Sequence, residues 1–527
     1  MNKIERDQPV ITIVNTPPTE RSILNGKRSI DVYSGIKTPA LGPAVIHGVL
    51  LGGGYRNVNT LDPRFNTRDA RFRTTEAKFT ESDFNLLAHS DYVLVSSMTR
   101  NRQVSLRLIE WVELNNPDAT IVIGGPDATF KPELWLEGGK GKRYVVRNEG
   151  EETIKELMHA FKDGRSAEGI RGVSYKKDGV IINNEDRPLL TEAELSAVPL
   201  PFFPKEIIKN GDANVVESKR GCPNKCEFCS VTALYKGSYR LKDDKTVINL
   251  LKAGKPGKST FFVDDNFAHK SRITEVKRGM QAIIDAGLND RDYYMQLDTV
   301  TVNTDPEFIG LGRKMGLYGA FLGIESVDDE VLRAKHKAAT AGQNMSAVKI
   351  FDDHDVFVVG MEMMGGKMET RKSIDNQRTW NNLSGLSGVQ IFAETPIVGS
   401  KLADQKIVLP IAERDTNLID GQREVTIPDY GFTCSGIQQE IIDAYSDFYG
   451  LRHLPSALRP LRHFLRDPER ALKLTAMNMG IRIYGRSLLH KFVNSEYTKN
   501  FNEYQKEIDN QIYAEGIKAF EAQQRKI

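Results

Sequence analysis

Two stretches of this chain alternate strand-like and helix-like segments, and this alternation constrains the fold more than any other sequence feature. In the first stretch, β-branched runs such as residues 10–15 ("VITIVN"), 92–98 ("YVLVSSM") and 119–125 ("ATIVIGG") alternate with helical segments. Strands that are separated by helices pair in parallel, because the helix carries the chain back across the sheet. Residues 10–160 therefore predict a doubly wound α/β domain whose ligands bind on the loops that follow its strands.

The second stretch repeats the strand–helix unit. Its expected strands are residues 213–220, 259–267, 293–302, 319–326, 356–366 and 388–400. This repetition predicts a partial (β/α)6 barrel of the TIM type, in which the active site gathers at the carboxyl ends of the strands. The strand pattern stops near residue 420, and residues 434–450 and 482–527 read as helices.

The length of 527 residues exceeds what one hydrophobic core supports, so several domains are expected. The proline-rich segment "RPLLTEAELSAVPLPFFP" reads as a linker between the two α/β units. The expected order is a Rossmann-like domain (1–186), a linker (187–212), the barrel (213–420) and a helical C-terminal domain (421–527). The first domain lacks a G-x-G-x-x-G fingerprint after its first strand, so a dinucleotide is not indicated.

The charge balance and the cysteine content limit the location and the partners. The formal net charge of +2 gives no global field that would attract nucleic acid, so no nucleic-acid partner is expected. No apolar run reaches the length that spans a bilayer, and the N-terminus does not resemble a signal peptide. Four cysteines are too few for a disulfide scaffold. These features predict a cytoplasmic protein without a transmembrane segment.

Three of the four cysteines lie within eight residues. Cys222, Cys226 and Cys229 form a C-x3-C-x2-C pattern, and no histidine stands near them. A structural zinc site needs four ligands, usually in two separated pairs, whereas three thiolates suit an iron–sulfur cluster with one open iron. The pattern therefore favours an iron–sulfur site with chemistry at the open iron. A zinc site completed from elsewhere and simple burial remain the alternatives.

With Phe228 before the last cysteine, this motif resembles the signature of the radical SAM enzymes. The resemblance implies a 4Fe-4S cluster whose open iron binds S-adenosylmethionine (SAM). It also implies reductive cleavage of SAM to a 5'-deoxyadenosyl radical that abstracts hydrogen from a substrate. A fourth cysteine would block the iron that SAM must occupy.

The match is closest to the radical SAM subgroup with an N-terminal cobalamin-binding domain (class B-like). That subgroup's motifs look like "RGCP..C.FC", "F.DDNF" and "GIES", and this chain carries them at residues 220–229, 262–267 and 323–326. "GGPDAT" and "NEGEET" resemble its cobalamin domain. The D-x-H-x-x-G motif, which supplies a histidine to cobalt in many cobalamin domains, is absent. Either cobalamin binds without a protein ligand to cobalt, or the domain has lost it.

The resemblance also implies the residues that contact SAM. Asp264 and Asp265 stand where the family contacts the SAM amino group, and Glu325 and Ser326 stand where it contacts the ribose and methionine portions. For these four residues the alternative is a solvated strand end or a helix cap. The further candidates are Gln296 and Asp298, which alternate on one strand and either face the barrel interior or make structural hydrogen bonds, and Arg240, an anion contact or a surface arginine.

The cobalamin candidates lie on the loops after the strands of the first domain, where ligands of such sheets bind. They are Asn15, Thr16, Ser97, Met98, Thr99, Gly124, Gly125, Pro126, Glu149 and Gly150. For the glycine pair, the alternative is a tight turn without a ligand.

Cys434 stands alone near an expected helix start. It is either a small buried hydrophobe or a hydrogen-atom donor to a substrate radical.

Three functions remain open at this stage. The first is a radical SAM enzyme that abstracts hydrogen from an unactivated carbon and transfers a methyl group to it from cobalamin. The second ends instead in cyclisation, carbon–carbon coupling or rearrangement, and the third is a non-catalytic iron–sulfur or cobalamin sensor. The enzyme readings require an electron donor such as flavodoxin or ferredoxin. The substrate, whether a small molecule, a lipid or a peptide, is not fixed by the sequence.

Overall fold

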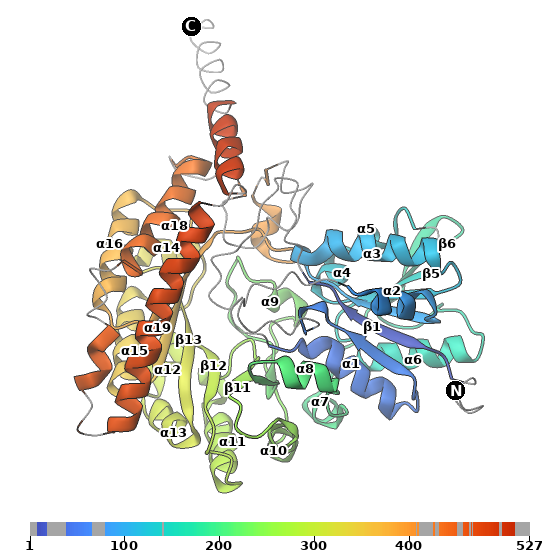
Figure 1. Ribbon diagram of the computed structural model, residues 1–527, viewed down its shortest axis with the longest axis horizontal. Helices are drawn as coiled ribbons and strands as arrows, with labels where there is room; N and C mark the ends of the chain where they lie inside the picture. Colours follow the sequence, from blue (N-terminus) through green and yellow to red (C-terminus); the bar gives the residue numbers. More distant parts are fainter. Residues whose placement is uncertain are drawn as a thin grey trace, which may run out of the picture.

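The computed structural model describes residues 8–17, 38–65, 79–139, 142–406, 408–409, 425–426, 432–450, 457–462, 465, 467–494 and 498–511. Two sheets lie side by side, and helices fill the remaining space around them (Figure 1). This arrangement confirms the predicted fold class: a doubly wound α/β unit, a partial α/β barrel and a helical C-terminal region.

The first sheet has the strand order β2-β1-β3-β4-β5-β6-β7. Its strands are β1 (Ile11–Asn15), β2 (Val58–Leu61), β3 (Tyr92–Ser96), β4 (Thr120–Gly124), β5 (Lys142–Val146), β6 (Val173–Lys177) and β7 (Val180–Asn183). β1 to β5 are parallel, as predicted, but β6 and β7 add an antiparallel hairpin that the sequence analysis missed. The β6–β7 turn has only two residues, too few for a crossover helix.

Helices cover both faces of this sheet, and each face has its own apolar cluster. The helices are α1 (Leu41–Gly52), α2 (Glu81–Ala88), α3 (Arg102–Asn115), α4 (Pro126–Phe130), α5 (Pro132–Leu136) and α6 (Glu151–Lys162). Buried side chains of α1 and α6 pack on one face, and those of α3 and α5 pack on the other. The strands are apolar in consecutive positions because both of their faces are buried.

The second sheet is wholly parallel, with the order β15-β14-β13-β12-β11-β8. Its strands are β8 (Asn214–Val216), β11 (Thr260–Phe262), β12 (Tyr293–Asp298), β13 (Leu317–Glu325), β14 (Phe357–Met364) and β15 (Gly388–Ala393). A separate two-stranded ribbon joins β9 (Lys219–Arg220) to β10 (Arg240–Leu241). The β12 strand was predicted to reach residue 302, but it ends at Asp298, where that side chain caps the next helix.

Helices between the strands cover the outer face of this sheet. They are α10 (Asp244–Ala253), α11 (Ile273–Asp285), α12 (Thr299–Thr304), α13 (Glu307–Met315), α14 (Asp329–Ala334), α15 (Ala341–Asp353) and α16 (Arg371–Leu383), whereas the short α9 (Val231–Leu234) has no buried residue and lies outside this layer (Figure 1). Most of these helices bury an apolar stripe against the strands in one large core cluster. This layer holds the sheet as an open, six-stranded part of a barrel.

The linker is ordered and contains two short helices, α7 (Glu192–Ala197) and α8 (Lys205–Asn210). Thr191 begins α7 with a capping box that includes Glu194, a combination that stabilises a helix start. Glu192 accepts hydrogen bonds from the Leu241 backbone and from Arg272, which belong to the barrel unit. The linker is therefore fastened to the second sheet.

Two C-terminal helices, α18 (Cys434–Phe448) and α19 (Pro468–Val493), pack against the second sheet. α19 starts well before the predicted residue 482, and its Leu474 packs in a cluster with Tyr318 and Phe321 of β13 and their neighbours. These β13 side chains alternate with those facing the outer helices, so α19 covers the concave face of the sheet. A further helical stretch is described to residue 511, and the last sixteen residues of the predicted helix lie outside the described residues.

α18 protects the exposed edge of β15. The Tyr445 hydroxyl lies 2.8 Å from the Ile391 amide and 3.0 Å from the Ile391 carbonyl, and it also accepts a bond from Gln390. Tyr449 makes the same pair of contacts with Val389. Edge strands expose unpaired backbone groups, so the two tyrosines replace the missing neighbouring strand.

Tyr445→Phe is expected to destabilise the protein by about 1–3 kcal/mol, because it leaves buried backbone groups of Ile391 without a partner. The ring packing is retained in this variant, so the loss isolates the hydrogen bonds. Chemical denaturation of Tyr445→Phe, with Tyr504→Phe at a partly buried tyrosine as the control, measures the effect. Equal stability of the two variants would contradict this assignment.

Among the described residues, no helix has the length and the apolar character required to cross a membrane.

Candidate active site

The cysteine loop lies between β9 and α9, at the carboxyl end of the barrel sheet. Cys222, Cys226 and Cys229 are all partly buried on this loop. The Cys229 amide donates to the Cys226 carbonyl at 3.2 Å, and the Thr232 hydroxyl donates to the Asn224 carbonyl at 2.6 Å. These local bonds shape the loop so that three thiols lie on one short segment.

Glu227, in the middle of the loop, ties it to two other barrel loops. Its amide donates to the Lys335 carbonyl at 3.3 Å, and its carboxylate pairs with His336 at 2.8 Å. Its carbonyl accepts from the Leu402 amide at 3.1 Å. The cysteine loop is therefore held by the loops that follow β13 and β15.

The surroundings of the thiols disfavour free thiolates. Burial raises the pKa of the Cys222 thiol to about 12 and that of Cys226 to about 11, and it also raises the pKa of Cys229. Bound metal stabilises the thiolate form and overcomes such a penalty. Three thiols on one loop are a soft donor set, which suits iron–sulfur ligation.

Among the described residues, no three histidine, cysteine or acidic side chains converge as ligands of a single metal ion. In a four-iron cube each thiolate binds its own iron, so the cysteine sulfurs do not need to meet at one point. The donor set of the loop therefore fits a cluster.

Asp264 and Asp265 follow β11 and face the start of the cysteine loop. Asp264 is buried and accepts hydrogen bonds from the Ser218 backbone and side chain and from the Lys219 amide. Asp265 accepts from the Gly221 amide at 2.9 Å. Although Asp265 is exposed to water, the surrounding protein atoms raise its pKa to about 6. Asp264 therefore fixes the backbone of residues 218 and 219 just before the cysteine loop. Asp265 has part of its carboxylate exposed to water.

Gln296 and Asp298 lie on β12 and share the face that points into the barrel with Tyr294. Asp298 caps α12 through the Thr301 amide at 2.7 Å and accepts from Asn266 at 2.7 Å. Gln296 donates to the Asp264 carbonyl at 3.3 Å. Both residues therefore make structural hydrogen bonds, the alternative to contact with SAM. These bonds also connect β12 to the segment that follows β11.

Glu325 and Ser326 end β13 at the barrel mouth. Glu325 has a positive φ of 60°, a strained conformation for a residue with a side chain, and the register with β14 shifts beside it. Asn344 holds this turn by donating to the Ile324 and Ser326 carbonyls at 2.9 and 2.8 Å. The Glu325 carboxylate pairs with Lys337 at 2.9 Å.

The cobalamin candidates lie together at the carboxyl edge of the first sheet. Asn101 links two of their loops, because it donates to the Thr16 carbonyl and accepts from the Met98 amide. The Met98 side chain is 59% exposed, whereas Ser97 is fully buried and its hydroxyl has no hydrogen-bond partner among the described residues.

The glycine pair fits closely against this edge. Gly125 has a φ of 103°, and a Cβ there would lie 2.3 Å from the Ser97 carbonyl oxygen. The backbones of the two loops therefore touch. The unpartnered hydroxyl and the exposed Met98 are consistent with a bound group at this edge.

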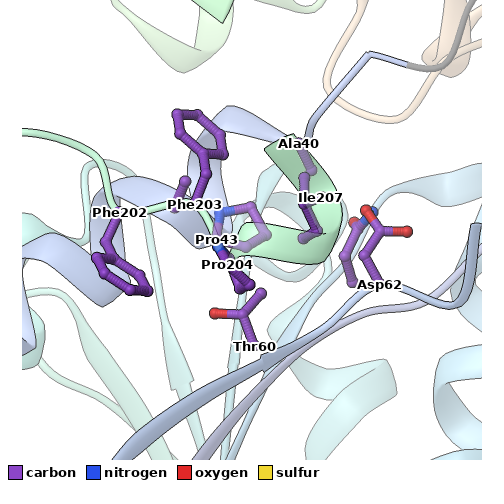
Figure 2. Close-up of a pocket in the computed structure, with 10 residues that line it drawn as sticks. Ala40, Pro43, Thr60, Asp62, Phe202, Phe203, Pro204 and Ile207 are labelled. Atoms are coloured by element: carbon purple, nitrogen blue, oxygen red, sulfur yellow. The ribbon is translucent and has the colours of Figure 1, made fainter. Parts of the chain in front are cut away.

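Figure 2 shows a small pocket at the same end of β1 and β2, beside α1 and α8. Its volume is about 10 Å³, enough for about one water molecule. Its lining residues are Asn15, Ala40, Pro43, Ala44, Thr60, Asp62, Phe202, Phe203, Pro204 and Ile207. Linker residues close this pocket from above, so it is a packing defect of the domain boundary and too small for a cofactor.

Glu149 and Arg240, predicted to contact two different cofactors, contact each other. Arg240 donates to Glu149 at 2.9 Å, and Arg220, two residues before Cys222, donates to Glu149 at 2.8 Å. Arg220 also pairs with Glu151 and with Glu217. All of these groups are largely buried. Glu149 is therefore an ionic link between the edge of the first sheet and the base of the cysteine loop.

Cys434 starts α18, is fully buried, and packs in a small cluster with Leu409, Val425 and Phe501. Its thiol lies 3.3 Å from the Thr426 carbonyl. The structure therefore places it in a cluster separate from the main barrel core, in an environment that matches the buried-hydrophobe alternative.

Several buried charged residues beneath the barrel mouth were not predicted from the sequence. Glu394 pairs with Lys335 and Lys406, and all three are buried. Lys337, Glu362 and Glu369 belong to the same group. Lysines in "RAKHK" and a glutamate between two methionines give no local signal, because only the packing of distant strands brings them together.

Glu362 on β14 is fully buried and points toward α16, where Asn381 donates to it at 2.9 Å. Burial raises the pKa of Glu362 to about 8, so the folded protein holds it as the neutral acid at pH 7. The unfolded chain loses this proton near the ordinary value of about 4.5. The contribution is therefore fully favourable below about pH 4.5 and is lost as the pH rises toward 8.

Glu362→Gln is expected to raise the melting temperature at pH 8 and to leave it unchanged near pH 4.5, because glutamine stays neutral. The gap between variant and wild type should grow by about 1.4 kcal/mol per pH unit over this window. Calorimetric melting at several pH values measures it. A gap that is the same at every pH would show that Glu362 is not a protonated acid.

The sequence was compared with models of known families. A model of the radical SAM superfamily matches residues 216–376, and a model of the B12 binding domain matches residues 35–158. The first match runs from the end of β8 into α16, and the second ends within α6. The B12-binding match therefore covers β2 to β5 of the first sheet, and the radical SAM match covers β11 to β14 of the second.

Three curated relatives match between 44% and 63% of the chain. The chain is 29% identical to an uncharacterized methyltransferase of Pyrococcus horikoshii over 351 residues, 63% of this chain and 73% of that protein. It is 23% identical to the anaerobic magnesium-protoporphyrin IX monomethyl ester cyclase of Cereibacter sphaeroides (58% and 52%). It is 28% identical to the hopanoid C-3 methylase of Methylococcus capsulatus (44% and 45%). The chain thus spans about half the length of the last two.

Two solved structures share the fold at 15% identity. The radical SAM methyltransferase TsrM from Kitasatospora setae, with cobalamin and a [4Fe-4S] cluster bound, has a TM-score of 0.64 and covers 91% of this chain and 99% of its own. The cobalamin-dependent radical SAM enzyme OxsB has a TM-score of 0.61, with 91% and 72% coverage.

The matched domains and the shared architecture lead to one family. The cysteine loop lies at the carboxyl end of a partial barrel. The carboxyl edge of the first sheet lies beside this loop and is joined to it by the Arg220–Glu149 pair. The cofactors of this architecture are a 4Fe-4S cluster, SAM and cobalamin. The chain thus combines a B12-binding domain with a domain of the radical SAM superfamily.

Proposed function

We propose that this protein is a cobalamin-dependent radical SAM methyltransferase that acts on an unactivated carbon of its substrate. The observation that carries the proposal is the ionic link of Glu149, Arg220 and Arg240, which holds the edge of the B12-binding domain against the base of the cysteine loop. Methyl transfer needs the radical site and the methyl donor to reach the same substrate carbon, and this link keeps their two loops together.

When bound, the cluster with SAM supplies hydrogen-atom abstraction, and cobalamin supplies the methyl group. The three cysteines are the proposed ligands of the cluster. Asp265, open on one side, is the proposed acceptor for the SAM ammonium, while Asp264 holds the backbone before the cysteines. The carboxylate of Glu325 stands at the mouth for the polar part of SAM, since a carboxylate accepts bonds from hydroxyls and ammonium groups.

The chain also supplies an apolar surround for a reactive radical. Phe321 of β13 and Met361 of β14 lie on the concave face, and Leu474 of α19 packs against the same cluster. This helix fills the part of the barrel away from the cysteine loop. Excluding water protects a radical from side reactions, so we assign α19 and these side chains to that role.

Relatives support methyl transfer, because several carry the name methyltransferase or methylase, including the hopanoid C-3 methylase and the hopanoid C-2 methylase of Rhodopseudomonas palustris. One group of relatives is named for cyclisation instead. The methyl and cyclase outcomes differ in whether the SAM methyl group reaches the product.

The test uses the anaerobically reconstituted protein with SAM, a low-potential reductant, hydroxocobalamin and a panel of lipid, tetrapyrrole and peptide substrates, so that SAM is the only source of methyl groups. SAM deuterated in its methyl group should yield a product heavier by one labelled methyl group, together with 5'-deoxyadenosine. A product without label would replace methyl transfer with cyclisation or coupling. Protein that binds both metal cofactors but never forms 5'-deoxyadenosine would be a sensor.

A donor such as flavodoxin or ferredoxin is the proposed electron source, and the cytoplasm is the proposed location. A reducing compartment keeps three closely spaced cysteines available for a cluster. A reconstitution in which either donor replaces the chemical reductant tests this part.

A further inference from the structure

The turn that follows α14 lies directly against the cysteine loop. Lys335, His336 and Lys337 form this turn, and Glu227 of the cysteine loop contacts the first two of them through one backbone hydrogen bond and one carboxylate–imidazole contact. The Lys337 amide is fixed in addition by the Leu332 carbonyl at 2.9 Å. The position of Lys337 relative to the cysteines is therefore set by several independent contacts.

The Lys337 ammonium is largely buried and has one carboxylate partner. It lies 2.9 Å from Glu325, and only about 10% of each side chain is exposed. Its charge also acts on the cysteine loop: burial raises the pKa of Cys226, and the Lys337 charge is the first influence that opposes this rise. It acts in the same direction on Cys229.

Gly323 provides the space for this ammonium. A Cβ at Gly323 would lie 2.7 Å from the Lys337 nitrogen and 3.0 Å from a Glu325 oxygen. The strand β13 thus leaves a gap that the ion pair fills. A surface salt bridge forms without a glycine gap, a strained residue or a fixed turn. The Lys337–Glu325 pair has all three, which indicates a specific role for its position.

We propose that Lys337 is a positioning residue that holds a buried positive charge against the cysteine loop and raises the reduction potential of the cluster, while its ion pair orients Glu325 at the barrel mouth. The physical reason is that reduction adds one negative charge to the cluster. A fixed cation within a low-dielectric site favours the added electron, and a fixed carboxylate opposes it. The inference rests on cluster binding by the cysteine loop, which belongs to the proposed function.

The test is an electron paramagnetic resonance titration of the reconstituted cluster without substrate. Lys337→Met should shift the midpoint potential to a more negative value, and Glu325→Gln should shift it to a more positive value. The double variant, which restores the net charge, should return toward wild type. A merely structural role of the ion pair would not produce opposite shifts that cancel.

Lys406→Met is the matched control. Lys406 is also buried and pairs with a glutamate, Glu394, but it is not among the main charges that act on the three thiols. Its potential should match wild type. Lys337→Met with wild-type iron content and an unchanged potential would overturn the proposal.

If Lys337→Met does not retain iron, its reduction potential cannot be measured, and a second variant tests the proposal instead. Gly323→Ala keeps the charge but displaces the ammonium, so it should give a smaller negative shift. No shift in that variant would also overturn the proposal. If the wild-type protein itself held no cluster, the proposed function would fail first, and the two failures are therefore distinguishable.

Discussion

Replacing Cys226 with alanine is expected to abolish both cluster binding and 5'-deoxyadenosine formation. Three thiols are the whole donor set of the loop, and the remaining two cannot anchor a cube with one open iron. The loss should be complete rather than partial, because the SAM reaction needs the reduced cluster. Iron and sulfide content, the visible absorption of the reconstituted protein and chromatography of 5'-deoxyadenosine measure the outcome.

Cys434→Ala is the matched control for this variant. Cys434 is buried in a separate apolar cluster, so the variant should keep wild-type iron content and 5'-deoxyadenosine formation. Loss of product formation in Cys434→Ala, with iron and melting temperature intact, would instead revive the hydrogen-donor role. Iron content retained by Cys226→Ala would remove the cluster assignment of the loop.

Glu149→Leu is expected to destabilise the protein by about 3–5 kcal/mol, because it removes the carboxylate that pairs with the buried Arg240 and one of the three that pair with Arg220. Burial alone would raise the pKa of Glu149, but the hydrogen bonds and charges of these two arginines hold it below its usual range. The carboxylate is thus ionised at neutral pH. The variant should also loosen the contact between the two sheets.

Calorimetry and limited proteolysis of the linker measure this effect. The melting transition should fall and, where the two units separate, split into two, while residues 187–212 become sensitive to protease. Glu168→Ala removes one partner of an exposed pair with Lys177, so it should melt like wild type. If Glu149→Leu also melted like wild type, the buried link would carry no stability.

The sequence was sufficient for the two α/β units because their signals are local. Buried parallel strands such as residues 11–15 and 120–124 are continuous apolar runs, and helices such as 273–285 have one apolar face. The antiparallel hairpin of residues 173–183 was missed, because its strands alternate weakly and end at the surface. α19 was placed too late, since its packing partners are strands far away in sequence.

For the site, the sequence identified residues that a motif marks but not the partners that fix them. The cysteine loop and the acidic residues after β11 were predicted, and the structure brings them together. It did not reveal that Asp298 caps a helix or that Glu149 meets Arg240. Such pairings depend on side chains that approach from different strands, and no spacing along the chain encodes them.

The position of α19 has a consequence for how this enzyme reaches its native state in a cell. The concave face of the barrel sheet, with Tyr318, Phe321 and Phe357, is covered by a helix that the ribosome makes about 75 residues after the last barrel strand. Until that helix emerges, a broad aromatic surface faces water on the nascent chain. Delivery of iron and sulfide to the cysteine loop is therefore expected to follow synthesis of the entire barrel and its cover, rather than to accompany it.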